Sequence, residues 1–158
     1  MNVGQLMTHG VKTCRPQDSL NTAAKLMWDN NCGSVGVVAE GKVVGMLTDR
    51  DICMAAYTQG HLLSEMQISG AMSKKLFSCR PEDSLAKAEE IMRTNRIRRL
   101  PVIDADSHLV GILSLDDIAR EAMRERKDKQ RVEITAEEVC DTFAAVCGDS
   151  GQSVAATV

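Results

Sequence analysis

Aromatic residues are scarce in this chain: phenylalanine, tryptophan and tyrosine together make up 3% of its 158 residues. Proteins that bind single-stranded nucleic acid stack the bases on such side chains. A basic excess is missing too, because the formal net charge is −3 at pH 7, whereas nucleic-acid and anionic-membrane binders usually carry surplus lysine and arginine. We therefore expect neither a nucleic acid nor a membrane as partner.

Long apolar runs are also missing. No segment approaches the roughly 20 consecutive apolar residues that span a bilayer, and the first ten residues, MNVGQLMTHG, lack the basic and apolar regions of a secretory signal peptide. With 44% apolar and 26% charged residues, the composition is that of a globular protein. We expect a cytoplasmic protein with an aliphatic core.

The cysteines and histidines do not follow the spacing of a metal or catalytic site. The six cysteines lie at positions 14, 32, 53, 79, 140 and 147 without any Cys-x-x-Cys pair, and none of the three histidines is next to a cysteine. Zinc sites need ligands at short, defined spacings, and no Ser/His/Asp or Cys/His signature of a nucleophile is present. We expect free thiols, no metal and no enzymatic activity. A redox role for Cys14 or Cys79 is the alternative to their being core residues.

The chain contains a tandem duplication. Shifted by 65 positions, CRPQDSLNTAAKLMWDNNCGSVGVV from Cys14 matches CRPEDSLAKAEEIMRTNRIRRLPVI from Cys79, with ten identical residues among 25. After one inserted residue, VVGMLTDRDI from Val43 matches LVGILSLDDI from Leu109. Such self-similarity indicates two copies of one structural unit. We expect the first unit at 1–60, the second at 61–125, and a charged linker, a short helix and a disordered tail over 126–158.

Each unit is predicted to have the element order β-α-β-β-α. A short strand stops at Arg-Pro, Asp-Ser caps a helix, two strands form a hairpin, and a second helix follows. The expected ranges are 11–14, 18–30, 34–39, 43–48 and a helix from 49 in the first unit, and 76–79, 83–95, 100–104, 109–114 and a helix from 115 in the second. A unit of about 60 residues buries too little surface alone. We therefore predict an α/β (α+β) fold in which the two units pack through their sheets about a pseudo-twofold axis, with two equivalent clefts.

This order, together with IRRLPVID, LVGILSLDDI and VVGMLTDRDI, resembles the CBS-domain family, in which two tandem domains form a Bateman module. The resemblance covers residues 1 to 125. It implies clefts for adenosine-containing ligands (AMP, ADP, ATP or S-adenosylmethionine) that act as regulatory ligands, with no cofactor required. It also implies frequent dimers of modules. The chain is similar to stand-alone prokaryotic CBS-pair proteins, whose roles are mostly regulatory.

The residues at the strand-to-helix junctions support the same function. Thr48 can cap a helix, and Asp51 lies three positions on, on the same side of the first turn. A carboxylate can accept two hydrogen bonds from the vicinal hydroxyls of a ribose. Ser114 and Asp117 repeat the arrangement. The alternative interpretation is that both pairs only cap their helices.

The geometry of the family implies that each cleft joins this pair of one unit to the first strand and the start of the hairpin of the other unit. The residues so implied for the first cleft are Thr48, Arg50, Asp51, Leu76, Phe77, Ser78, Arg98, Arg99, Leu100 and Pro101. Those implied for the second cleft are Lys12, Thr13, Ser34, Val35, Ser114 and Asp117.

The two clefts are expected to differ in charge. Arg50, Arg98 and Arg99 suit a phosphate in the first cleft, whereas Asp116 replaces Arg50 in the second, and the Gly-Ser pair at 33–34 replaces the two arginines. We expect phosphorylated ligands to prefer the first cleft. The alternative is that Arg96, Arg98 and Arg99 form a solvated basic edge. Gly36 stands where the family usually has proline, which loosens the start of this strand.

The rest of the chain is predicted to add one helix. The charged run 121–131 is expected to be the exposed end of the preceding helix. A capping box at 135–138 then opens a helix through Val146, whose apolar stripe (Val139, Cys140, Phe143, Val146 and Cys147) must pack on the module or on a partner chain. The sequence as a whole predicts a non-enzymatic, homodimeric module that regulates a further, unidentified protein. The alternative is a structural or interaction module with vestigial clefts.

Overall fold

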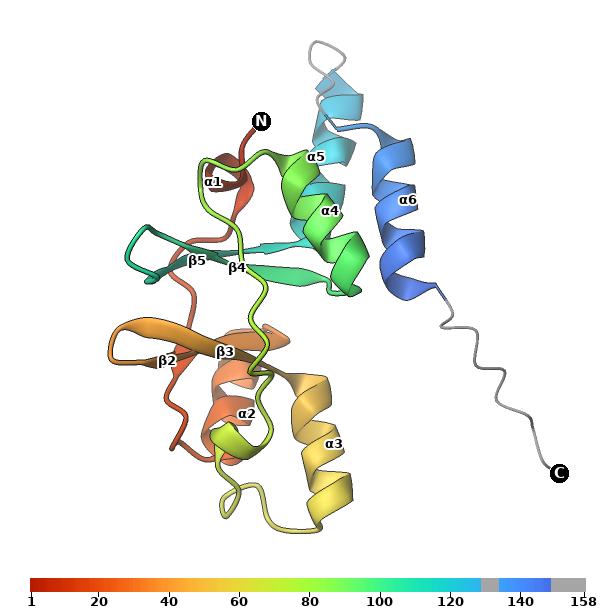
Figure 1. The fold of residues 1–158 in the computed structure, drawn as a ribbon. Coiled ribbons are helices and arrows are strands. Elements are labelled where there is room, and N and C mark those ends of the chain that lie inside the picture. Colours follow the sequence, from red (N-terminus) through yellow and green to blue (C-terminus); the bar gives the residue numbers. More distant parts are fainter. Residues whose placement is uncertain (129–133, 149–158) are drawn as a thin grey trace, which may run out of the picture.

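The computed structural model describes residues 1–128 and 134–148 (Figure 1). Part of the expected linker and the tail expected beyond Gly148 lie outside these residues. The elements in chain order are α1 (Val3–Leu6), β1 (Thr13–Cys14), α2 (Leu20–Asp29), β2 (Ser34–Ala39), β3 (Lys42–Thr48), α3 (Asp49–Gln59), the 3-10 turn η1 (Ile68–Gly70), α4 (Leu85–Asn95), β4 (Arg99–Ile103), β5 (Leu109–Ser114), α5 (Leu115–Asp128) and α6 (Ala136–Cys147).

The predicted helices begin where the caps predict. Ser19 and Ser84 are the N-caps of α2 and α4, and each side-chain oxygen accepts a hydrogen bond of 3.2 Å from a backbone N–H in the first turn. Such a bond satisfies one of the free N–H groups of the first turn. Apolar residues at helical spacing then bury one face of each helix, for example Leu20 and Met27 in α2.

Two antiparallel hairpins form the centre of the fold. β2 pairs with β3 from Ser34–Thr48 to Ala39–Lys42, and β4 pairs with β5. β1 adds a parallel strand to the first hairpin. The strand expected at 76–79 is reduced to one bridge between Cys79 and Val102. Pro101 explains this difference, because it has no N–H to donate to the carbonyl of a neighbouring strand.

The two repeats pack through their sheets, as the sequence predicts. Figure 1 shows the β2–β3 and β4–β5 hairpins facing one another, with α2 and α3 on one outer side and α4 and α5 on the other. The backbone N–H of Val43 donates to Ser107 O at 3.2 Å across this interface. Gly36 allows a close approach of the repeats, since a methyl group placed there would lie 2.5 Å from Leu109 Cδ2. The missing side chain at position 36 therefore makes room for the second repeat.

The leading segment of each repeat packs against the core of the other repeat. Val3 is fully buried in the second core and its N–H donates to Asp83 O at 2.9 Å. Ile68, its equivalent 65 positions later, is fully buried in the first core and donates to Asp18 O at the same distance. Each repeat therefore contributes its leading segment to the core of the other repeat, and the two contributions are equivalent under the duplication.

Helix α6 packs against α4 and α5 of the second repeat. Val146 and Thr142 are buried there, whereas Phe143 is 46% exposed, so only part of the expected apolar stripe is covered. Burial also reaches into the charged run: Glu125 on α5 is buried and accepts a hydrogen bond of 2.8 Å from the N–H of Ile134. The expectation that the whole run is exposed is therefore wrong.

Among residues 1–128 and 134–148, no helix covers the equivalent surface of the first repeat, on α2 and α3 (Figure 1). Trp28 is 86% exposed and Tyr57 is 82% exposed, and a cavity of about 470 Å³ lies beside Trp28, Met27 and Ile52. This α2–α3 face therefore differs from the α4–α5 face of the second repeat, which α6 covers. Across the part of the chain that the structure covers, none of the helices is long and apolar enough to cross a membrane.

Candidate functional site

Asp51 is fixed by the N-terminal cap of α3. Its Oδ2 accepts hydrogen bonds from the N–H of Thr48 at 2.9 Å and from Thr48 Oγ1 at 2.7 Å. Thr48 Oγ1 in turn accepts from the N–H of Asp51 at 3.2 Å, which completes a capping box. Oδ1 of Asp51 has no hydrogen-bond partner among the residues that the structure describes. The cap thus holds the carboxylate rigidly and leaves one oxygen for another donor.

Asp117 is held in the same way at the start of α5, with one difference. Its Oδ2 accepts from the N–H of Ser114 at 2.9 Å and from Ser114 Oγ at 2.6 Å. Its Oδ1 forms an ion pair with Arg120 Nη2. Asp117 is also buried, whereas Asp51 is partly exposed. Both oxygens of Asp117 are therefore engaged within the chain, so the two aspartates are not equivalent acceptors.

The first cleft has a volume of about 550 Å³ and lies between the repeats. Of the residues expected in it, it is lined by Thr48, Arg50, Asp51, Leu76, Phe77, Arg98, Arg99 and Pro101. Leu76 and Phe77 come from the extended segment before α4, and they bring apolar surface to the same cleft as Thr48 and Asp51. The cleft therefore combines apolar side chains with a carboxylate.

The charge of the first cleft is positive. Five basic side chains line it, and only two carboxylates oppose them; the basic residues are Arg50, Lys75, Arg96, Arg98 and Arg99. None of these four arginines forms an ion pair within residues 1–128 and 134–148. Lys75 Nζ lies 4.9 Å from the centre of the Phe77 ring, a cation–π contact. The arginines are thus open to an anion from solution.

The second cleft has a volume of about 410 Å³. Lys12, Ser34, Ser114 and Asp117 line it as expected. Asp116 and the Gly-Ser pair at 33–34 line it too, but so do two arginines that were not assigned to this cleft, Arg99 and Arg120. Three lysine or arginine side chains therefore face Asp116 and Asp117, and one of the three is the ion-pair partner of Asp117. The second cleft is still less positive than the first.

Four expected site residues lie outside both linings. Val35 and Leu100 are fully buried in the helix-facing cores of their repeats, because alternate residues of a strand point to opposite faces. Thr13 pairs with Gly36 in the sheet, and Ser78 directly precedes the Cys79 bridge. Burial therefore removes the side chains of Val35 and Leu100 from the clefts, whereas Thr13 is exposed and Ser78 is half-buried outside both linings.

Eight residues that line the first cleft were not assigned to it from the sequence, and Lys75 and Val146 illustrate two different causes. Lys75 lies two positions before Phe77, and an extended segment places such residues on one side, so a signal existed. Val146 lines the cleft from the end of α6. No motif links position 146 to the cleft, since its place depends on how α6 packs on α4 and α5.

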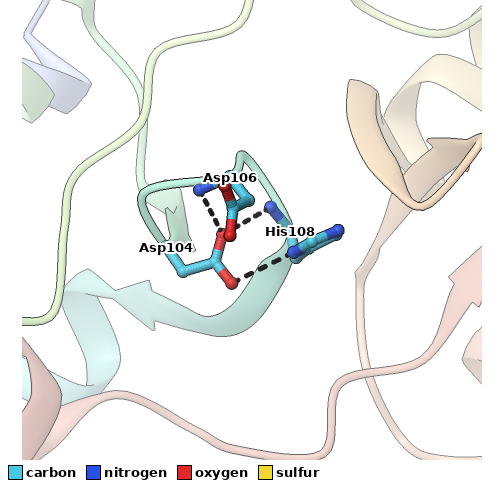
Figure 2. Close-up of side chains that lie close together, drawn as sticks. All are labelled: Asp104, Asp106 and His108. Atoms are coloured by element: carbon cyan, nitrogen blue, oxygen red, sulfur yellow. Dashed lines mark hydrogen bonds and ion pairs between the residues drawn. The ribbon is translucent and has the colours of Figure 1, made fainter.

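A separate cluster lies in the turn between β4 and β5. Asp104, Asp106 and His108 bring possible metal-ligand atoms within 4.8 Å of one another. Figure 2 shows why they gather: Asp104 accepts hydrogen bonds from the N–H groups of Asp106 and His108, at 2.9 and 2.8 Å, and lies 3.1 Å from His108 Nδ1. These bonds stabilise the turn, and they account for the cluster without an ion.

The thiols considered for redox chemistry are protonated at neutral pH. Burial raises the pKa of Cys79 to about 12, and the neighbouring Asp83 adds to the effect. Burial also raises the pKa of Cys14. Because the thiolate is the reactive form, both residues behave as small core side chains.

Comparison with known proteins identifies relatives of the whole repeated region. The family model for the CBS domain matches residues 3–57 and 65–124. The CBS domain-containing protein YhcV of Bacillus subtilis is 41% identical over 118 residues, which are 75% of this chain and 83% of that protein. Among solved structures, the CBS domain pair of MJ0100 in complex with 5-methylthioadenosine and S-adenosyl-L-methionine has a TM-score of 0.73 at 24% identity, and the match covers 79% of this chain and 98% of that one. CBSX2 in complex with AMP has a TM-score of 0.69 at 25% identity, with the same two coverages.

Proposed function

Because the chain belongs to the CBS-domain family, we propose that it is a regulatory module without enzymatic activity, which binds an adenosine-containing ligand between its two repeats. The ligand is AMP, ADP, ATP or S-adenosylmethionine. Binding of this ligand changes the interaction of the module with a separate protein. CBS-domain proteins are generally regulatory, and this chain carries the two CBS units with no site for bond-making chemistry recognised in its described residues.

The observation that carries the proposal is the free oxygen of Asp51 beside unpaired arginines in one cleft. In this arrangement, Asp51 Oδ1 accepts a hydrogen bond from a ribose hydroxyl, and Leu76 and Phe77 cover the adenine. The arginines at 50, 98 and 99 bind a phosphate through charge-assisted hydrogen bonds, which are about twice as strong as neutral ones. A ligand with an apolar base, a diol and an anionic tail satisfies all three features.

The comparison with CBSX2 supports this ligand class. That protein binds AMP and shares the fold of this chain over 98% of its own length. The size of the first cleft, about 550 Å³, lies within the range of roughly 300–1,000 Å³ that is usual for small-molecule sites.

A thermal-shift panel tests the proposal. A ligand that binds only the native state raises the melting temperature by mass action. We expect at least one of AMP, ADP, ATP and S-adenosylmethionine to raise it at millimolar concentration, with guanosine monophosphate as the matched control. Unchanged melting curves with all four compounds would refute ligand sensing.

We further propose that the module is a homodimer in the cytoplasm. The α2–α3 face, with Trp28 and Tyr57 exposed, supports a dimer because exposed apolar patches usually mark interfaces. The equivalent surface of the second repeat is covered, because α6 packs against α4 and α5. The six cysteines are free thiols, which suits a reducing compartment. Light scattering should give twice the chain mass of 17.2 kDa, and a monomer at micromolar concentration would refute the dimer.

The second candidate function is a structural or interaction module with vestigial clefts. The exposed α2–α3 face favours it, since this surface needs no ligand in order to bind a protein. The two candidates differ in the thermal-shift panel, because only the ligand-sensing module responds to an adenosine compound.

A further inference from the structure

Ser34 and Arg99 are equivalent positions of the duplication, 65 residues apart. Each is the first residue of the first strand of its hairpin, and each pairs in register with the hydroxyl residue that caps the following helix. Ser34 pairs with Thr48, and Arg99 pairs with Ser114. The pseudo-twofold relation of the repeats therefore also relates these two residues.

Both residues line both clefts. They stand where the two clefts meet, so each cleft has access to the same two side chains. One of the two is a buried serine and the other is a partly exposed arginine. A position that is symmetric in the fold thus supplies a single guanidinium to two sites.

The position of the Arg99 guanidinium fits this shared role. A methyl group placed on Gly33 would lie 3.3 Å from Arg99 Nη2 and 3.1 Å from Asp49 Oδ2. Gly33 lines the second cleft and Asp49 lines the first. Arg99 forms no ion pair with any residue that the structure describes. It can therefore turn toward a phosphate on either side.

We infer that the two clefts compete for Arg99, so that a phosphorylated adenosine ligand in one cleft lowers the affinity of the other cleft for a second one. This inference rests on the proposed function. When the Arg99 side chain turns into one cleft, its charge-assisted hydrogen bonds go to the phosphate there, and two phosphates that approach one cation also repel each other. The coupling is reciprocal, as for any pair of linked binding equilibria. Adenosine has no phosphate, so its two binding events are independent.

Isothermal titration with AMP and with adenosine tests this inference in variants that leave one cleft intact. Asp51→Asn weakens the first cleft and Asp117→Asn weakens the second, and an asparagine oxygen can still accept the capping hydrogen bond. Arg99→Ala is then added to each of them. We expect it to weaken AMP binding by about tenfold or more in both backgrounds and to leave adenosine binding unchanged. In the chain with both clefts intact, Arg99→Ala should lower the affinity for the first AMP molecule and leave the affinity for the second unchanged.

Arg98→Ala is the matched control, because Arg98 lines only the first cleft. It should weaken AMP binding in the Asp117→Asn background and have no effect in the Asp51→Asn background. The converse variant, Ser34→Arg, adds an arginine at the equivalent position and should raise the affinity for the second AMP. If AMP and adenosine both bind but Arg99→Ala weakens AMP binding in only one of the two backgrounds, the shared role of Arg99 is overturned, whereas the proposed function is not. Absence of binding of both compounds to the unmodified chain would overturn the proposed function together with it.

Discussion

Thr142 Oγ1 donates a hydrogen bond of 3.3 Å to Glu89 Oε1, and both residues are buried where α6 packs on α4. Burial raises the pKa of Glu89, and the carboxylate of Glu138 adds to this effect, while Thr142 and Arg93 oppose it. The position of α6 therefore depends on a carboxyl group that is poorly solvated when it is ionised.

We predict that Thr142→Val destabilises the protein by about 1–3 kcal/mol, because the buried carboxyl then loses its hydrogen-bond donor. Glu89→Gln keeps a hydrogen-bonding oxygen and removes the charge, so it should be neutral or stabilising at pH 7. Chemical denaturation measures both variants. Equal stability of Thr142→Val and the unmodified chain would show that the bond contributes nothing.

The same carboxyl predicts a pH dependence. The folded-state pKa of Glu89 lies above its unfolded value of 4.5, so the folded state binds the proton more tightly. Its contribution to stability is therefore fully present below pH 4.5 and is lost as the pH rises through the raised pKa. The difference in unfolding free energy between Glu89→Gln and the unmodified chain should grow across that interval. A difference that is constant with pH would contradict the prediction.

Asp51→Ala should weaken an adenosine ligand at the first cleft by about 1.5–3 kcal/mol, the range for hydrogen bonds to a charged group. It also removes the capping box of α3, so the melting temperature should fall as well. Asp51→Asn keeps an acceptor for the cap and separates the two effects. If calorimetry gives unchanged affinity for every adenosine ligand, Asp51 is a capping residue only.

Phosphorylated ligands should prefer the first cleft, because it has the larger surplus of basic side chains. Arg98→Ala is expected to weaken AMP binding by about 1 kcal/mol, since Arg98 is exposed. It should leave adenosine binding unchanged and reduce the salt dependence of AMP binding. Arg80→Ala, an exposed arginine outside both clefts, is the control. A crystal soaked with AMP that filled only the Ser114–Asp117 cleft would overturn the preference.

Gly36→Ala should destabilise the protein by about 1 kcal/mol, the low end of the range for overpacking, because the new methyl group meets only the end of the half-buried Leu109 side chain, which can partly move aside. Gly70→Ala is a matched control, because a methyl group there has open space around it. The double variant Gly36→Ala with Leu109→Ala should recover part of the loss, which a double-mutant cycle measures. Without such a recovery, the clash is not the cause.

Ile68→Ala should destabilise the protein by about 2–5 kcal/mol, the range for deleting a buried isoleucine side chain down to its Cβ, because Ile68 is fully buried. Leu62→Ala, at a site that is 67% exposed, should change stability by less than about 0.5 kcal/mol. Similar unfolding midpoints for the two variants would contradict the buried role of the leading segment.

Local chemistry made much of the fold predictable from the sequence. Ser19, Ser84, Thr48 and Thr135 each mark the start of a helix through a cap that depends only on the next three residues. The duplication also indicated that each repeat has one hairpin with a helix before it and a helix after it. The shortening of the strand expected at 76–79 could also have been predicted, because Pro101 on the strand beside it lacks an N–H.

The contacts between segments that are distant in the sequence could not be predicted from local chemistry. The duplication makes Val3 and Ile68 equivalent, but it does not say which core each one enters. The reach of Arg99 into the second cleft and the place of Val146 in the first depend on packing in three dimensions. The charge of each cleft therefore could not be predicted from the sequence alone, because residues from distant segments contribute to it.

The exchanged leading segments bear on the order in which the molecule is made. Synthesis starts at the N-terminus, so Val3 leaves the ribosome long before Leu100, Leu113 and Ile118, the core residues that will bury it. The first repeat, in turn, lacks a wall of its core until Ile68 has been added. Neither repeat completes its core on its own during translation, and residues 3–8 reach their final place only after the second repeat has been made.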